Sequence, residues 1–190
     1  RRSVDPSLRV EGEEYEETTS GYPRFTEGAR YWLQWSGFDT DVYSAKDNLD
    51  DYKEDYMSRA HWVNALMGGS KHLSDEEGKN IPIDLAFAFH SDAGVRLNDD
   101  VIGTLGIYST KENHGEFDND ISRLRSRDLT DLIMTQIVDD IKVKYEPNWT
   151  RRGMWDRAYY EARMPACPTM LLELLSHQNF ADMRYGLDPS

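Results

Sequence analysis

Hydrophobic and polar positions change period along the chain, which predicts helices and strands in turn. Apolar residues recur at helical spacing over 26–35 and 55–67, and glycines follow both segments. The longest helical pattern covers 120–145, with a stripe of leucines and isoleucines along one side. Nearly continuous apolar runs are typical of strands covered on both faces, and they occupy residues 81–89, 101–108 and 170–175.

Shorter segments complete this pattern. Residues 38–44 and 159–163 are predicted as short strands, and a helix is expected from Asn179 onward. Residues 1–20 are polar and acidic, which indicates an arm or linker ahead of one domain over 21–190. The alternation of helices and strands predicts the α/β class, with a mostly parallel twisted sheet and helices on both faces.

Two of the predicted strands carry a polar residue suited to chemistry. His90 ends the run DLAFAFH, and Glu173 lies inside TMLLELLSH. Ligands of parallel sheets lie beyond the carboxyl ends of the strands, where His90 is expected. An imidazole and a carboxylate there suggest a metal site with a general base. The alternatives are a hydrogen-bonded structural His90 and a Glu173 that is buried in a salt bridge.

Composition narrows the possible partners. The formal net charge is −13, so a nucleic-acid-binding surface and adsorption to anionic membranes are both disfavoured. No stretch is long and apolar enough to span a bilayer. The single cysteine, Cys167, excludes an internal disulfide framework, and its position between prolines favours a buried, unreactive thiol.

Three segments together resemble a known enzyme family. NIPIDLAFAFHSDAG and PACPTMLLELLSHQNFADM are similar to the metal-binding and catalytic motifs of zinc-dependent N-acetylmuramoyl-L-alanine amidases. DDYKEDYMSRAHWVNAL resembles the helix that precedes their metal strand, and GYPRFTEGARYWLQWSGF resembles a gut-bacterial secreted branch associated with a golvesin-type β domain. The resemblance covers about residues 20–190.

The resemblance implies roles for individual residues. His90 and Glu27 would bind Zn²⁺, with Glu16 and Glu17 as alternatives to Glu27, and Glu173 would be the catalytic base. Residues assigned to substrate contact are Arg59, His177 and Asn179. The family also has a first zinc-binding histidine on a glycine-rich loop, and nothing in this sequence matches it. The sequence therefore resembles the C-terminal part of the enzyme domain, apparently without its N-terminal strand.

The implied function is hydrolysis of the N-acetylmuramoyl-L-alanine amide bond in peptidoglycan by a secreted, periplasmic or envelope protein. Two alternatives stay open: a non-catalytic envelope or glycan-binding domain of the same fold, and a zinc carboxypeptidase. Besides peptidoglycan, we expect a partner segment, either an N-terminal segment or an inserted β domain of the same protein. Without it, the domain would expose an apolar surface at its sheet and bind zinc weakly.

Overall fold

The computed structural model describes residues 21–94 and 100–188, and it separates the chain into two compact units, Arg1–Ser58 and Arg59–Ser190. The boundary falls inside helix α3, Asp51–Met67. The two units are described one at a time. Among the described residues, no helix is long and apolar enough to cross a membrane.

The N-terminal unit is helical throughout its described part. It contains η2 (Arg24–Thr26), α1 (Ala29–Trp35), α2 (Thr40–Tyr43) and the first turns of α3. The predicted helix over 26–35 is confirmed from Ala29 onward. The predicted strand over 38–44 is wrong, because residues 40–43 form one helical turn that buries Val42. A strand needs a neighbour to pair with, and the described residues of this unit contain none.

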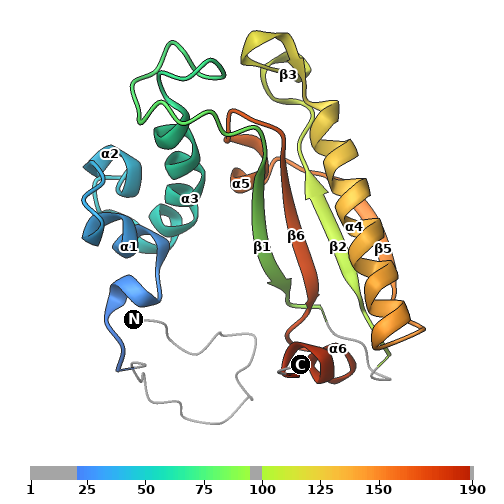
Figure 1. Ribbon diagram of the computed structural model, residues 1–190. Coiled ribbons are helices and arrows are strands. Elements are labelled where there is room, and N and C mark those ends of the chain that lie inside the picture. The colour runs from blue at the N-terminus through green and yellow to red at the C-terminus, as the bar shows by residue number, and fades with distance from the viewer. Residues whose placement is uncertain (1–20, 95–99, 189–190) are drawn as a thin grey trace. The chain divides into compact units, whose positions relative to one another are not determined.

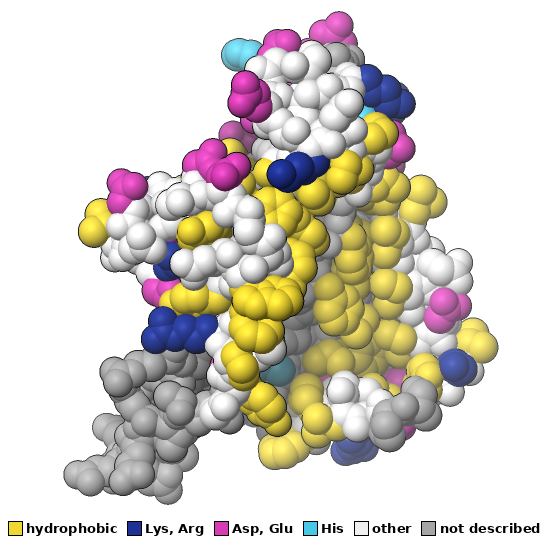
Figure 2. All heavy atoms as spheres, turned by 60° about the vertical axis from the view of Figure 1, so that its left-hand side comes forward, with side chains coloured by type: hydrophobic (Ala, Val, Ile, Leu, Met, Phe, Trp, Pro, Cys, Tyr) yellow, Lys and Arg dark blue, Asp and Glu magenta, His cyan; other side chains and the backbone are white. Residues whose placement is uncertain are grey.

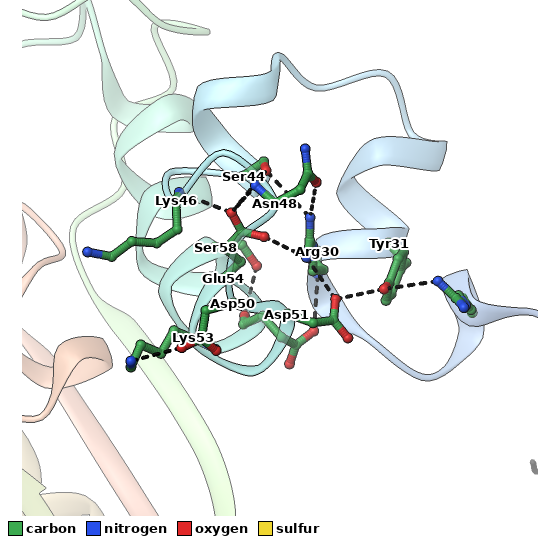
Figure 3. Close-up of polar contacts among 12 residues, drawn as sticks. Arg30, Tyr31, Ser44, Lys46, Asn48, Asp50, Asp51, Lys53, Glu54 and Ser58 are labelled. Carbon is green, nitrogen blue, oxygen red and sulfur yellow. Dashed lines mark hydrogen bonds and ion pairs between the residues drawn. The ribbon is translucent and has the colours of Figure 1, made fainter. Parts of the chain in front are cut away.

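A buried arginine holds this unit together (Figure 3). The Arg30 guanidinium lies 2.7 Å from Asp51, 2.6 Å from Glu54 and 2.6 Å from the Asn48 side chain. Glu54 in turn accepts hydrogen bonds from the backbone N–H groups of Lys46 and Asn48. The loop after α2 is thus held to Arg30 through Asn48 and to Glu54 through two backbone N–H groups.

The C-terminal unit is built on a four-stranded sheet in the order β1-β6-β2-β5 (Figure 1). The pairs β1–β6 and β2–β5 are parallel, and β2 and β6 run antiparallel at the centre. The strands are β1 (Ala86–Asp92), β2 (Thr104–Tyr108), β5 (Arg151–Asp156) and β6 (Thr169–Ser176). Two parallel pairings out of three confirm a mostly parallel sheet.

Helices cover both faces of this sheet. On one face, Met134 of α4 (Leu124–Lys144) packs against Met170 and Leu172 of β6. On the other, Met67 of α3 packs with Cys167, next to β6. The unit also contains two further helices, two 3-10 turns and a small hairpin: α5 (Tyr160–Arg163), α6 (Phe180–Gly186), η3 (Glu112–Gly115), η4 (Asp118–Asp120), and β3 (Glu116–Phe117) with β4 (Ile121–Ser122). The predicted α/β class is confirmed.

Glycines allow two close approaches to β2. A side chain at Gly106 would collide with Thr130 and Met134 of α4. Gly103 has a φ of +82°, and a side chain there would collide with the backbone of Thr150. Both glycines therefore set how closely neighbouring segments pack against β2.

The segment between α4 and β6 differs from the sequence prediction. Residues 159–163 were expected to be a strand, but Tyr160–Arg163 form α5, and the strand is β5 at Arg151–Asp156. As an edge strand, β5 is only partly buried, so its sequence RRGMWD lacks the apolar run that marks a central strand. The prediction of a helix after Asn179 is confirmed by α6.

Strand β1 forms one edge of the sheet and carries exposed aromatic side chains. Phe87 and Phe89 are 48% and 65% exposed, and Leu85, just before the strand, is also exposed. Phe87 and Phe89 pair in register with Met170 and Leu172, so they lie on the α4 face of the sheet. Hydrophobic side chains gather in the middle of the surface that Figure 2 shows. The edge strand β1 thus exposes several apolar side chains, and a partner segment that covers them stays a prediction.

Candidate active site

The pairing of β1 with β6 places His90 directly beside Glu173. The two residues are register partners in this parallel pair, and the register shifts between His90 and Asp92. Such an irregularity bends a strand and redirects the side chains that follow it. His90 and Glu173 lie on the face opposite α4, because their neighbours in the alternation, Ala88 and Leu171, pack together there. The register therefore makes the two residues neighbours, and their assignment to one functional site stays a prediction.

Glu173 is a carboxyl group in an unfavourable environment for charge. Burial raises its pKa above the ordinary value, and the negative charge of Asp92 adds to the effect, while His90 and Arg152 oppose it. Its Oε2 atom is buried and has no hydrogen-bond partner among the described residues. The alternative of a salt-bridged Glu173 is not what the contacts show, because no ion pair of Glu173 lies within 4.0 Å among the described residues. An unpaired buried carboxylate oxygen is costly and is typical of a functional group.

Polar residues surround Glu173 at this end of the sheet. Asp92 at the end of β1 and Arg152 near the start of β5 form an ion pair at 2.6 Å, which joins the two edge strands. His177 follows β6, and its Nδ1 lies 3.0 Å from the Ser91 hydroxyl. The predicted substrate-contact residue His177 thus lies next to the end of β1, and its role stays a prediction.

Glu161 is a site residue that the sequence analysis missed. This residue of α5 places Oε2 3.0 Å from His90 Nε2, and its side chain is largely buried. Arg59 Nη1 lies 3.4 Å from both Glu161 oxygens. Arg59, assigned to substrate contact from the resemblance, is therefore engaged with Glu161. No sequence signal marked Glu161, because it lies in the short segment YYEAR that was predicted as a strand of no special chemistry.

Two side chains in the C-terminal part of α3, His61 and Asn64, hold α5 and the residues that follow it. Tyr160 Oη lies 2.6 Å from His61 Nε2. The Asn64 amide donates to the Met164 carbonyl at 3.0 Å and accepts from the Ala166 N–H at 2.8 Å. These contacts satisfy backbone groups after α5 and hold Glu161 against His90.

The motif after β6 has a structural role in this fold. Asn179 caps α6 by accepting the Asp182 N–H, and its amide donates to the Asp100 carbonyl. Asp182 is fully buried and accepts from the backbone N–H groups of Ile102, Gly103 and Ser176. Both ends of the Asn179 amide are used inside the protein, and its assignment to substrate contact stays a prediction.

Glu27 lies in the N-terminal unit, exposed, at the end of η2. Its alternatives Glu16 and Glu17 lie outside the described residues. Among the residues that the structure describes, no three His, Cys, Asp or Glu side chains are grouped as a metal site would require. The predicted set of His90 and Glu27 on Zn²⁺ stays a prediction.

Comparisons with solved structures give a likeness in fold. No family model matches the sequence, and no curated protein matches it. The fold is similar to a solved structure of the CwlD amidase from Clostridioides difficile in complex with the GerS lipoprotein, with 15% sequence identity and a TM-score of 0.48. The match covers 86% of this chain and 73% of that chain. Because the TM-score is below 0.5, the α/β class rests on the sheet and helices described above.

Proposed function

We propose that the protein hydrolyses an amide bond in peptidoglycan, between N-acetylmuramic acid and L-alanine, with Glu173 as the general base. The observation that carries the proposal is the buried Glu173 oxygen that has no hydrogen-bond partner, beside His90 across the β1–β6 pair. The substrate is inferred from the resemblance of the segments around these two residues to the amidase motifs.

Glu173 has the properties that a base in amide hydrolysis needs. The pKa of Glu173 is raised and so lies closer to neutral pH than that of an ordinary glutamate. Its carboxylate therefore binds a proton more readily. It would take a proton from the attacking water and deliver it to the leaving amine, which regenerates the carboxylate. Arg152, held by Asp92, keeps positive charge at this end of the sheet and favours the ionised form of Glu173.

Zinc is part of this proposal. When bound, Zn²⁺ polarises the substrate carbonyl and lowers the pKa of a bound water to about 7. The C-terminal unit offers one donor of the kind that zinc takes, the His90 imidazole, but the described residues hold no group of three such donors. Catalytic zinc usually has three protein ligands, and Glu27 is the further ligand that the sequence resemblance implies.

The Glu173→Gln variant tests the assignment of the base. We expect it to lose at least about 1,000-fold in turnover while keeping its fold, because the amide has nearly the same shape and cannot accept the proton. The measurement is release of stem peptides from purified peptidoglycan, followed by mass spectrometry. The control is Glu116→Gln, an exposed glutamate on the β3 hairpin. Glu27 is exposed as well, but it is a proposed zinc ligand and so cannot serve as the control. Wild-type release of stem peptides by the Glu173→Gln variant would rule out the proposed mechanism.

A non-catalytic envelope-binding domain is the second candidate. It is favoured by one observation, that the described residues include no group of three metal donors. This reading expects the protein to bind purified cell walls without stoichiometric zinc and without releasing any fragment. The same mass spectrometry separates a third reading, a zinc carboxypeptidase, because that enzyme would free a terminal amino acid.

A further inference from the structure

Strand β5 contains an irregularity in its pairing with β2 that decides where two of its side chains point. Two residues of β5, Arg152 and Gly153, oppose a single residue of β2, Leu105. Such a bulge interrupts the alternation of side chains between the two faces of a sheet and redirects them. Arg152 and Trp155 are three residues apart, so a regular strand would point them to opposite faces. With the bulge between them, the Arg152 guanidinium lies 5.9 Å from the centroid of the Trp155 ring.

Trp155 lies on the face of the sheet that carries Glu173. Its register partner on β2 is Ile107, and the partner of Ile107 on β6 is Leu171, two residues before Glu173. Register partners share a face of the sheet, and so do residues two apart on one strand. Ile107 and Leu171 are buried, whereas Trp155 is 42% exposed. Trp155 is therefore an apolar side chain on this face that a ligand can reach.

Arg152 connects Trp155 to the candidate active site. Its Nη1 donates to Asp92 Oδ2 at 2.6 Å at the end of β1, and its positive charge opposes the rise in the pKa of Glu173. The Arg152 side chain is 21% exposed. A guanidinium carries five N–H donors, and the bond to Asp92 uses only one of its nitrogens. The indole is thus bordered by N–H donors and by a carboxylate acceptor.

We propose that Trp155 binds a sugar ring of the glycan strand, with Arg152 and Asp92 contacting the hydroxyl groups of that sugar. A pyranose presents C–H groups on its faces, which pack against an aromatic ring, and hydroxyls around its edge, which need donors and acceptors. An exposed indole beside a guanidinium and a carboxylate meets both needs. The inference rests on the proposed function for the identity of the substrate, and it adds that the glycan lies on the β5 side of the site.

The charge of these residues favours the neutral sugar over the stem peptide as their ligand. A stem peptide would present carboxylate groups, and its recognition would need a cation. The Arg152 guanidinium is already neutralised by Asp92 at 2.6 Å. A second carboxylate at Arg152 would be repelled by Asp92, whereas sugar hydroxyls can both donate to Asp92 and accept from Arg152.

Binding of a neutral sugar tests this inference on the full chain. The probe is the N-acetylglucosamine tetramer, which has a glycan backbone and carries no stem peptide. In calorimetric titrations, Trp155→Ala should weaken binding of the tetramer at least about fivefold, because the aromatic face is lost. Trp155→Phe keeps a smaller ring and should bind with intermediate affinity. The matched control is Trp35→Ala, which removes a tryptophan that is 65% exposed in the N-terminal unit and should leave the affinity unchanged.

NMR of the indole N–H groups gives a second measurement on the wild-type chain. The Trp155 signal is identified as the one that disappears in Trp155→Phe, and it should shift when the tetramer is added. The Trp35 signal, identified in the same way from its own variant, should not shift. Thermal melts identify any variant that has lost its fold. If Trp155→Ala is such a variant, the Trp155 signal of the wild type decides.

Four results would overturn the inference. They are wild-type affinity in a folded Trp155→Ala variant, an equal loss in Trp35→Ala, an unshifted Trp155 indole signal, and no measurable binding of the tetramer to the wild type at about 10 mM. A fifth is a Trp155→Ala variant that loses affinity for a sugar-free stem peptide and keeps it for the tetramer. The proposed function fails separately, through stem-peptide release by Glu173→Gln, because binding of the tetramer requires no turnover.

Discussion

Glu173 and Cys167 are two weak acids that burial affects in the same direction and with different consequences. Burial raises the pKa of the Glu173 carboxyl group, which lies among charged residues at the end of the sheet. Burial also raises the pKa of the Cys167 thiol to about 11, and the hydroxyl of Thr169 opposes the effect only in part. The carboxyl group lies where charged neighbours can tune it, and the thiol is packed among Met67 and Leu73.

The acid limb of the pH profile of kcat/KM should depend on Arg152. Glu173 works as a base only when ionised, so kcat/KM should fall as the pH drops through its raised pKa. Arg152 lowers this pKa and also pairs with Asp92, whose negative charge raises it. Arg152→Gln should therefore move the acid limb to higher pH. A pH–rate profile that is unchanged, or that moves to lower pH, would contradict this role.

Cys167 should be unreactive in the folded protein. With a pKa of about 11, only about one thiol in a thousand is ionised at pH 8. The folded state favours the protonated thiol, so this contribution to stability is complete below about pH 8.5 and is lost as the pH rises toward 11. We expect an aromatic disulfide reagent at pH 8 to react at least about 100-fold more slowly with native protein than with urea-unfolded protein. Equal rates would place the thiol at the surface.

At the scale of elements, polar side chains add to apolar packing in fixing several segments around the site. Asn64 connects α3 to the backbone after α5, and Asp182 connects α6 to the start of β2 and the end of β6. Each supplies hydrogen bonds to backbone groups that would otherwise be buried without partners. These two residues therefore determine where α5 and α6 lie relative to the sheet.

Asp182→Asn should destabilise the protein by about 2–3 kcal/mol. The amide replaces one accepting oxygen with a donor that faces backbone N–H groups, and Asp182 is completely buried. Urea unfolding followed by circular dichroism measures the change in free energy. The matched control is Asp139→Asn on the exposed side of α4, for which we expect a change within about 0.5 kcal/mol. A similar small change in Asp182→Asn would show that the hydrogen bonds contribute little.

At the scale of the whole molecule, the edge strand β1 has two features that favour association. Its aromatic side chains Phe87 and Phe89 are exposed, and on the described residues the strand pairs only with β6. An exposed apolar edge strand offers both backbone hydrogen bonds and hydrophobic area to another chain. His90 lies on this same strand, so association at β1 would take place close to it.

Replacing the exposed aromatic side chain at the centre of β1 should reduce self-association of the isolated chain. We expect Phe89→Lys to lower the weight-average mass at high protein concentration, because an edge lysine opposes strand pairing. The control Val143→Lys removes an even more exposed apolar side chain from α4, away from any strand. Analytical ultracentrifugation compares the two variants. Equal behaviour of both would show that β1 is not the site of association.

Much of the fold could be predicted from local sequence, because the deciding signals are local. The strands β1, β2 and β6 and the helices α3 and α4 follow apolar runs and periodic stripes that a short window contains. The two short strands predicted at 38–44 and 159–163 were wrong, since a segment of five to seven residues takes its conformation from its neighbours in space. In the same way, β5 forms a strand at the sheet edge without an apolar run.

The sequence by itself determined that His90 and Glu173 belong to strands, because each lies in or at the end of an apolar run. Only the tertiary structure decided what surrounds them. The register of β1 against β6 makes the two residues neighbours, and the anchoring of α5 by Asn64 brings Glu161 to 3.0 Å from His90 across about 70 residues of chain. Strand register and helix docking depend on packing between distant segments, so no local pattern contains them. The sequence therefore identified His90 and Glu173 as candidate functional residues, and the fold set the distances between them and their neighbours.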